Sequence, residues 1–369
     1  MEHKMTPNTP SVIPRAKIAI LLFLATFLFA SLSHSKETRY YQKLSGGEVN
    51  CLLCPRSCVL RDGQTGVCRT RKNEKGTLVS LVYGKLVSMN ADPVEKKPLF
   101  HFLPQTATLS VATAGCNLRC NFCQNWTISQ IEPDEVRSRD VSPEELIAAA
   151  KAGNCPSISY TYSEPTAYYD YVYDCAKLAR KHGIKNILVT SGYINPEPLK
   201  ELCSVIDAAN VDLKGFSDNT YRWVAAARLA PVLESLKILK ENEVWLEVGY
   251  LVIPSVNDSE KELKAMVAWI SDNLGKDVPV HFLRFFPMHK LTNLPPTPVS
   301  KLEEAYKLAK AAGLNYVYIG NVPGNSAGNT YCPKCKKLLI GRKGYFVEAN
   351  NIRGGKCRYC GEKIHGIWK

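Results

Sequence analysis

The sequence predicts an α/β fold: a partial or full (β/α) barrel, with a small cysteine-rich module before it and another after it. Short apolar strands alternate with helix-like segments over residues 106–322. Such alternation is typical of parallel βα units, which close into a barrel or form a doubly wound sheet. Cysteines gather in both flanking regions and directly after the first strand of the alternating region. The expected segments are residues 1–36, 37–105, 106–322 and 323–369.

The alternating region divides into strands and helices of ordinary length. The expected strands cover residues 107–113, 157–162, 186–191, 209–214, 244–253, 280–286 and 315–320. The expected helices cover roughly residues 142–153, 166–182, 196–206, 231–242, 258–273 and 300–313. Ser142 with Glu145 predicts a capping box, and Ser300 with Glu303 repeats it in the last helix, which ends on Gly313. In a barrel, active-site residues follow the C-terminal ends of the strands.

The N-terminal segment, residues 1–36, contains an uncharged apolar run. The run KIAILLFLATFLFASLS covers residues 17–33 and follows Arg15 and Lys17. This pattern resembles a signal peptide or a short membrane anchor. Basic residues flank the run on both sides, so the positive-inside rule leaves its orientation open. We interpret the segment as signal-like or as a membrane anchor.

The distribution of charge argues against a nucleic-acid-binding protein, and the cysteine spacing argues against a secreted disulfide framework. The net charge is +13, but the basic residues are scattered and no aromatic-rich RNA-binding signature accompanies them. We therefore expect a solvated basic surface and no nucleic acid partner. Most of the 14 cysteines are separated by two or three residues, which suits a metal better than a disulfide framework. Cys155, Cys175 and Cys203 stand apart and are expected to be small buried side chains.

Two groups of four cysteines flank the alternating region. The first comprises Cys51, Cys54, Cys58 and Cys68, and the second comprises Cys332, Cys335, Cys357 and Cys360. The second group consists of two Cys-x-x-Cys pairs around a hairpin-like segment, which predicts a zinc ribbon, with an iron centre as the alternative. The first group can hold zinc or an auxiliary iron–sulfur cluster, because four thiolates are enough for either. Structural metal is the interpretation that we favour.

The third group lies in AGCNLRCNFCQNW, residues 114–126. Cys116, Cys120 and Cys123 are too few to close a structural zinc site, which takes four ligands. They are also one short of the four thiolates of an ordinary [4Fe–4S] cluster. If they hold such a cluster, one iron stays free to bind a small chelating molecule. The alternative is half of a zinc site that is completed from elsewhere in the chain.

The motif CNLRCNFC after the first strand of a βα barrel matches the defining motif of the radical S-adenosylmethionine (SAM) superfamily. CQNWTIS, SYTYSEPT, VTSGYI, VDLKGF, YLVIPSVND and IGNVPGN follow in order. With these motifs the chain resembles the AmmeMemoRadiSam-system radical SAM enzymes, relatives of the pyruvate formate-lyase activating enzyme, from about Cys51 to Cys360. The resemblance implies a barrel of the radical SAM type, with SAM chelated to the open iron of a [4Fe–4S] cluster. It also implies reductive cleavage of SAM to a 5′-deoxyadenosyl radical, which abstracts hydrogen from an unidentified substrate.

The resemblance assigns roles around SAM to residues at successive strand ends. Glu164 is expected to accept a hydrogen bond from the SAM amino group, although Tyr162 and Ser163 replace the two glycines that precede this glutamate in the family. Lys214 is expected to neutralise the SAM carboxylate, and Asp212 to make a polar contact. Taken alone, each has a simpler alternative: Glu164 can begin a helix, Lys214 can lie on the surface and Asp212 can belong to a turn.

The other implied contacts concern the nucleoside and the methionyl part of SAM. Phe122 is expected beside the adenine. Thr190, Ser191 and Gly192 are expected along the ribose or the methionyl part. His289 corresponds to a histidine near the nucleoside. Tyr162 is expected to face the cavity.

Three functions remain open at this point. The first is a radical SAM enzyme that modifies a small molecule or a partner's side chain, and the second is an activating enzyme that installs a glycyl radical. The third is a non-catalytic iron–sulfur or zinc scaffold. The expected partners are a reductant such as flavodoxin or ferredoxin, together with AMMECR-type and Memo-type proteins. Because such a cluster is oxygen-sensitive and SAM is cytosolic, we expect the catalytic domain in the cytoplasm, either free or attached to a membrane through residues 17–33.

Overall fold

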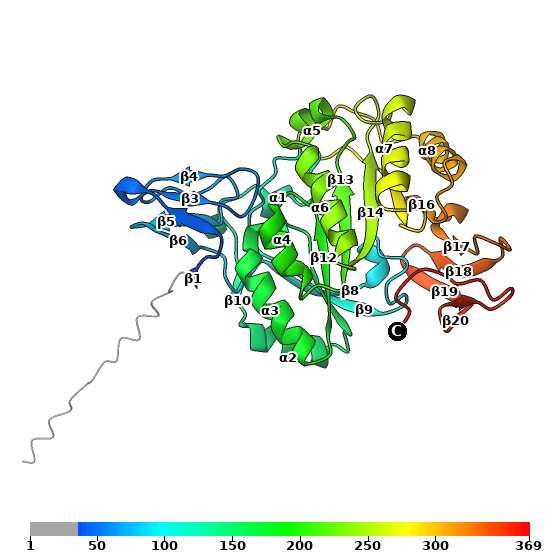
Figure 1. Cartoon of the computed structure of the whole chain (residues 1–369), viewed down its shortest axis with the longest axis horizontal. Helices are drawn as coiled ribbons and strands as arrows, with labels where there is room; N and C mark the ends of the chain where they lie inside the picture. The colour runs from blue at the N-terminus through cyan, green and yellow to red at the C-terminus, as the bar shows by residue number, and fades with distance from the viewer. Residues whose placement is uncertain (1–35) are drawn as a thin grey trace, which may run out of the picture. The chain divides into compact units, whose positions relative to one another are not determined.

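In the computed structural model of the chain, residues 36–369 are described, and their centre is a sheet of eight strands in the order β16-β15-β14-β13-β12-β11-β9-β8 (Figure 1). The strands are β8 Ser88–Pro93, β9 Ala107–Ala112, β11 Ser157–Tyr160, β12 Lys185–Thr190, β13 Ala208–Leu213, β14 Trp245–Val252, β15 Val280–Arg284 and β16 Val317–Gly320. Neighbours from β9 to β16 are parallel, and β8 is antiparallel to β9. The order follows the chain without reversal and β8 and β16 are edges, so the fold is a partial barrel and not a doubly wound sheet.

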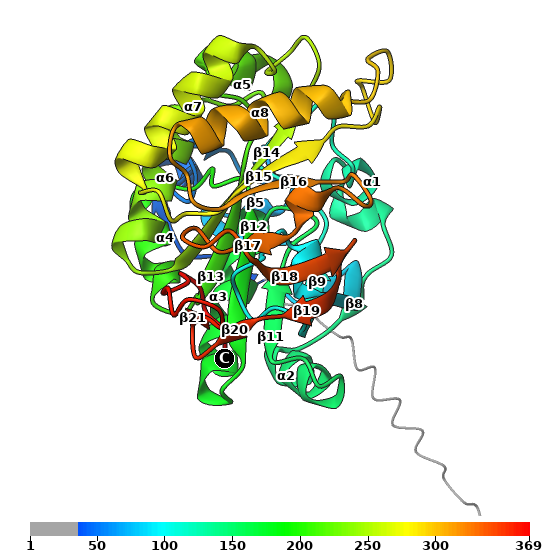
Figure 2. The same ribbon diagram turned by 90° about the vertical axis from the view of Figure 1, so that its right-hand side faces the viewer.

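Helices connect the parallel strands and lie along the outer face of the sheet (Figures 1 and 2). They are α2 Pro143–Ala152, α3 Tyr169–Lys181, α4 Pro196–Cys203, α6 Ala230–Glu241, α7 Glu260–Asn273 and α8 Val299–Ala311, with the short α1 Trp126–Ser129 and α5 Asp218–Ala225. The strand–helix alternation predicted from the sequence is therefore confirmed. Apolar side chains of the strands and of the inner helix faces form one large core.

One predicted helix cap is confirmed and the other is wrong. The backbone N–H of Glu145 donates to Ser142 Oγ at 3.2 Å, and the N–H of Ser142 donates to Glu145 Oε2 at 2.7 Å. Ser300 does not cap α8, because the helix begins at Val299 after Pro298 and Ser300 already lies in its first turn. Gly313 follows the end of α8 with φ of 89°, the left-handed conformation that glycine adopts without strain.

A buried carboxylate closes the N-terminal end of the barrel strands. Glu247 in β14 accepts hydrogen bonds from the N–H groups of Phe100 and His101 at 2.9 and 2.7 Å. It also accepts from Trp245 Nε1 at 3.0 Å and from His281 Nε2 at 2.7 Å. The segment between β8 and β9 is thereby held across this end of the sheet.

Small sheets precede and follow the barrel. The first module contains β1 Lys36–Glu37, β2 Tyr41–Lys43, β3 Val49–Cys51, β4 Val59–Leu60, β5 Arg71–Glu74, β6 Thr77–Ser80 and β7 Lys85–Leu86, the last paired with β10 Arg139–Asp140. The second contains β17 Thr330–Tyr331, β18 Leu338–Lys343, β19 Phe346–Asn350, β20 Ile352–Arg353 and β21 Lys356–Cys357. A fully buried ion pair, Arg71 to Asp170 at 2.7 Å, joins the first module to α3. Arg342 in β18 donates to Phe100 O at 2.8 Å and joins the second module to the barrel.

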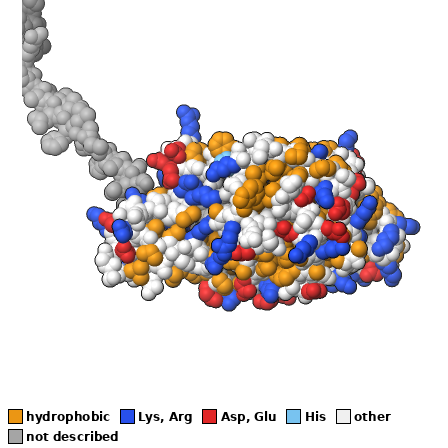
Figure 3. All heavy atoms as spheres, turned by 90° about the horizontal axis from the view of Figure 1, so that it is seen from above, with side chains coloured by type: hydrophobic (Ala, Val, Ile, Leu, Met, Phe, Trp, Pro, Cys, Tyr) orange, Lys and Arg blue, Asp and Glu red, His pale blue; other side chains and the backbone are white. Residues whose placement is uncertain are grey.

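Basic and acidic side chains are interspersed over the face drawn in Figure 3, as expected for a solvated basic surface. Within residues 36–369, no helix combines the length and the apolar character needed to cross a membrane. The apolar run of residues 17–33, on which the anchor prediction rests, lies outside the described residues.

Candidate active site

The three-cysteine loop connects β9 to α1 at the C-terminal end of the sheet. Cys116, Cys120 and Cys123 line a common cavity of about 470 Å³. The loop is held from the outside by contacts with the end of α5: the N–H groups of Arg119 and Asn121 donate to the carbonyls of Ala225 and Val224 at 3.0 and 2.8 Å. Its conformation is therefore set by the protein rather than by the thiols alone.

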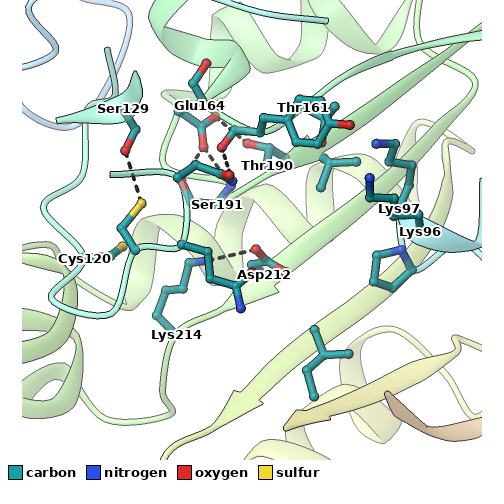
Figure 4. Close-up of a pocket in the computed structure, with 18 of the residues that line it drawn as sticks. Lys96, Lys97, Cys120, Ser129, Thr161, Glu164, Thr190, Ser191, Asp212 and Lys214 are labelled. Carbon is teal, nitrogen blue, oxygen red and sulfur yellow. Dashed lines mark hydrogen bonds and ion pairs between the residues drawn. The ribbon is translucent and has the colours of Figure 1, made fainter. Parts of the chain in front are cut away.

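The same cavity is lined by side chains from the ends of the next three strands (Figure 4). Glu164 follows β11, Thr190 and Ser191 end β12, and Asp212 and Lys214 belong to the end of β13. Because parallel strands bring their carboxyl ends to one edge of a sheet, residues distant in the sequence meet here. The structure thus brings together five of the residues that the resemblance assigned to SAM.

Glu164 is buried, and both oxygens of its carboxylate accept hydrogen bonds from neighbouring residues of the protein. Oε1 accepts from Thr166 N at 3.2 Å, from Thr166 Oγ1 at 2.9 Å and from Thr190 Oγ1 at 2.6 Å. Oε2 accepts from the N–H and the hydroxyl of Ser191, both at 2.8 Å. An ionised carboxylate offers about four lone-pair sites, so the shell is already complete. Glu164 also caps the 3-10 helix Pro165–Tyr168, as in the simpler alternative considered for it.

Asp212 and Lys214 form an ion pair at the cavity wall, with Lys214 Nζ 2.9 Å from Asp212 Oδ2. The lysine side chain is only 13% exposed, which excludes the surface-lysine alternative. Burial by itself lowers the pKa of Lys214, but the negative charge of Asp212 outweighs this effect and raises the pKa above its usual value. Lys214 is therefore a fixed positive charge beside the cysteine loop.

The donor set fits a [4Fe–4S] cluster with one open iron. Three thiols line the cavity, and within the described residues no Cys, His, Asp or Glu joins two of them in a tight group of ligand atoms. The Ser163 hydroxyl, also on the cavity wall, is buried without a hydrogen-bond partner. Burial raises the pKa of the Cys116 thiol well above its usual value and that of Cys120 to about 12, so metal binding there must release protons.

Three residues assigned from the resemblance do not line this cavity. Phe122 is buried beneath Lys214, with its ring centroid 5.8 Å from Nζ. Gly192 has φ of 67° and packs its Cα against Val211 and Val232, where an added Cβ would lie 3.1 and 3.4 Å from their methyl groups. His289 stacks on Trp126 with the ring centroids 5.3 Å apart.

Sequence reasoning missed the side of the cavity that faces the cysteines. Figure 4 shows Lys96 and Lys97 across the cavity from Cys120. Both amines contact Asp92 at 2.8 Å, and burial lowers the pKa of Lys97 to about 8. Tyr162 lines the cavity, as predicted, and its hydroxyl donates to Asp92. Tyr345, in the hairpin of the C-terminal module, lines it as well. The lysines precede the first βα unit, so no periodic signal marked them.

The C-terminal cysteines form a compact tetrad. The sulfur atoms of Cys332, Cys335, Cys357 and Cys360 all lie within 4.8 Å of one another. Cys332 Sγ is 3.6 Å from Cys360 Sγ, and Cys335 Sγ is 3.7 Å from Cys357 Sγ. Zn–S bonds of about 2.3 Å in a tetrahedron separate the sulfurs by about 3.8 Å. The spacing is therefore that of four thiolates around a single tetrahedral metal ion.

Comparison with known proteins agrees with this architecture. Residues 110–267 match the Radical SAM superfamily. An uncharacterized protein of Methanocaldococcus jannaschii is 48% identical over 331 residues, covering 89% of this chain and 98% of its own. The pyruvate formate-lyase 1-activating enzyme of Escherichia coli is 23% identical over 185 residues, covering 48% of this chain and 72% of its own.

Among solved structures, a radical SAM methyltransferase from Sphaerobacter thermophilus aligns with a TM-score of 0.46 and 15% identity, covering 58% of this chain and 67% of its own. The superfamily match begins within β9 and includes the cysteine loop and the strand ends that line the cavity. The chain belongs to the radical SAM superfamily.

Proposed function

We propose that this protein is a radical SAM enzyme, similar to the pyruvate formate-lyase activating enzyme, that abstracts hydrogen from a substrate held in the 470 Å³ cavity. The observation that carries the proposal is the shared wall of this cavity: three thiols, a fixed lysine charge and a buried carboxylate meet there. When bound, the cluster supplies the electron that cleaves SAM to methionine and the 5′-deoxyadenosyl radical.

The residues of the chain bind and orient SAM. Lys214 pairs with the SAM carboxylate, and Asp212 keeps the lysine directed into the cavity through their 2.9 Å contact. The SAM ammonium group donates to Glu164 in place of a hydroxyl, because the hydroxyl of Ser191 can rotate away whereas its N–H cannot. Charge-assisted contacts of this kind are shorter and stronger than neutral ones.

The substrate occupies the end of the cavity formed by Lys96, Tyr162 and Tyr345. This end is walled partly by the C-terminal module, which narrows the space available to a protein loop. The geometry therefore favours a small molecule or a protruding side chain over the backbone glycine of a large partner. Activation of a glycyl radical enzyme is the second candidate, and the similarity to activating enzymes favours it.

Anaerobic reconstitution tests the proposal. The protein with iron and sulfide, incubated with SAM and dithionite, is expected to release 5′-deoxyadenosine, and SAM is expected to change the electron paramagnetic resonance (EPR) signal of the reduced cluster. The Cys120→Ala variant is expected to lose both, whereas Cys203→Ala, a buried cysteine outside the site, keeps them. A reduced signal that ignores SAM would indicate the non-catalytic scaffold. Transfer of deuterium from a labelled partner peptide would favour the glycyl radical alternative.

The same proposal includes the sequence-based predictions about the C-terminal metal, the electron donor and the protein partners. We propose zinc in the C-terminal tetrad, which the sulfur spacing supports, and flavodoxin or ferredoxin as the electron donor. The AMMECR-type and Memo-type partners are implied by the resemblance to the AmmeMemoRadiSam-system enzymes and stay predictions. The division at residues 36, 105 and 322, and a cytoplasmic catalytic domain with or without attachment through residues 17–33, stay predictions.

A further inference from the structure

The N-terminal cysteines form a second site directly behind the radical SAM loop. Cys51, Cys54, Cys58 and Cys68 line a small cavity, and Asn117 of the radical SAM loop lines it too. An added Cβ at the buried Gly66 would lie 3.7 Å from the sulfurs of both Cys58 and Cys68, so these two thiols flank the same backbone position. Four thiols thus converge from one module on one enclosed space.

The spacing of these sulfurs differs from that of the C-terminal tetrad. The four C-terminal sulfurs all lie within 4.8 Å of one another. Among the N-terminal cysteines, which lie within the described residues 36–369, no three sulfurs are that close together. A zinc ion needs its four sulfurs about 3.8 Å apart, since every thiolate binds the same ion. A [4Fe–4S] cluster separates its thiolates further, because each binds a different iron. The N-terminal set is thus wider than one shared ion requires, and in this respect it resembles Cys116, Cys120 and Cys123, whose sulfurs form no such tight group either.

Buried hydrogen-bond donors at the cavity also fit an anionic cluster. Arg71 is 2% exposed, and its Nε is buried without a hydrogen-bond partner. Arg56 has a buried Nη2 atom that is likewise unpartnered. Both side chains line the cavity of the four thiols. Unpartnered buried donors are costly, and sulfides or thiolates in the cavity can accept from them.

The two cysteine loops are in direct contact. Gly115, immediately before Cys116, has φ of 91°, and an added Cβ would lie 2.6 Å from the carbonyl oxygen of Cys68. Arg56 Nε donates to Asn117 O at 2.9 Å. The last cysteine of the N-terminal group therefore packs against the residue that precedes the first cysteine of the radical SAM motif.

We propose that Cys51, Cys54, Cys58 and Cys68 ligate a second [4Fe–4S] cluster, and that this cluster relays electrons toward the radical SAM loop. It accepts one electron from a low-potential donor such as reduced flavodoxin or ferredoxin and gives up one electron to the neighbouring site, so its own oxidation state is restored after each transfer. The relay role rests on the proposed function, whereas the ligation of a cluster does not.

Iron analysis of the full-length chain tests the ligation. The anaerobically reconstituted wild type is expected to hold about eight iron atoms per chain, four in each cluster. A variant with Cys116, Cys120 and Cys123 all replaced by Ala is expected to retain about four, with a reduced EPR signal that SAM does not change. A matched control replaces Cys155, Cys175 and Cys203 by Ala and is expected to keep about eight.

The outcomes separate this inference from the proposed function. Loss of all iron from the first variant, or zinc bound in place of iron by the N-terminal cysteines of the wild type, would overturn the inference. Retained iron in that variant, together with a wild-type signal that is insensitive to SAM, would support the second cluster and reject the proposed function. Mössbauer spectra of the same samples identify the cluster type without relying on activity.

Discussion

Replacing Glu164 by Gln removes the charge of the buried carboxylate while keeping its size. The carboxylate accepts hydrogen bonds from Thr166, Thr190 and Ser191, so it holds the ends of β11 and β12 together. In the proposed function, it also receives the SAM ammonium group. The variant therefore changes two properties that can be measured separately, the stability of the fold and the affinity for SAM.

The structure allows both effects to be estimated. With the amide oxygen in the position of Oε1, the amide NH₂ faces the N–H of Ser191, and one buried donor is left without an acceptor. Such an orphaned donor costs about 1–3 kcal/mol of stability. A hydrogen bond to a charged group contributes about 1.5–3 kcal/mol, so the dissociation constant for SAM should rise about 10- to 150-fold.

Calorimetric titration of the anaerobically reconstituted protein with SAM measures the affinity, and urea denaturation measures the stability. Glu247→Gln is the matched control, because Glu247 is also buried and accepts hydrogen bonds from four donors, but does not itself line the cavity. It should lower the stability comparably and leave the SAM affinity unchanged. A Glu164→Gln variant that is destabilised but binds SAM like the wild type would refute the ammonium contact and leave Glu164 as a positioning residue for the strand ends.

Three further predictions concern the cysteine loop, the N-terminal end of the barrel strands and the C-terminal module. Gly115→Ala should reduce the iron bound by the radical SAM loop, because its Cβ would lie 2.6 Å from Cys68 O; an iron content equal to that of the wild type would contradict this. Burial lowers the pKa of His101 to about 4 in the folded protein. In the unfolded state the imidazole keeps its usual pKa of about 6.5, so as the pH falls the unfolded state binds a proton first. Stability should therefore fall by on the order of 3 kcal/mol between pH 6.5 and 4, measured by urea unfolding, and this pH dependence should shrink in His101→Asn. Cys357→Ser should release one zinc per chain and lower the melting temperature, without changing the iron content; retained zinc would contradict the tetrad assignment.

The local pattern of the sequence was enough to predict most of the fold. Strand–helix alternation predicted the parallel sheet, because each element has its own hydrophobic period and its own end signals. Ser142 with Glu145 predicted a cap correctly, since all its atoms come from one turn. The predicted cap at Ser300 was wrong because α8 begins one residue earlier, at Val299, directly after Pro298.

The sequence by itself marked the three cysteine groups as metal ligands, because the spacing within each pair or triplet is local, but it left open which metal the two outer groups hold. Only the tertiary structure decided how the thiols differ in separation, why Glu164 is already saturated with donors, and that Lys96 and Tyr345 face the same cavity as Cys120. These features depend on contacts between segments far apart in the chain. The donors to Glu164 come from the neighbouring strand end, and Tyr345 reaches the cavity because the C-terminal module packs against the barrel. Neither arrangement leaves a periodic or spacing signal in the sequence.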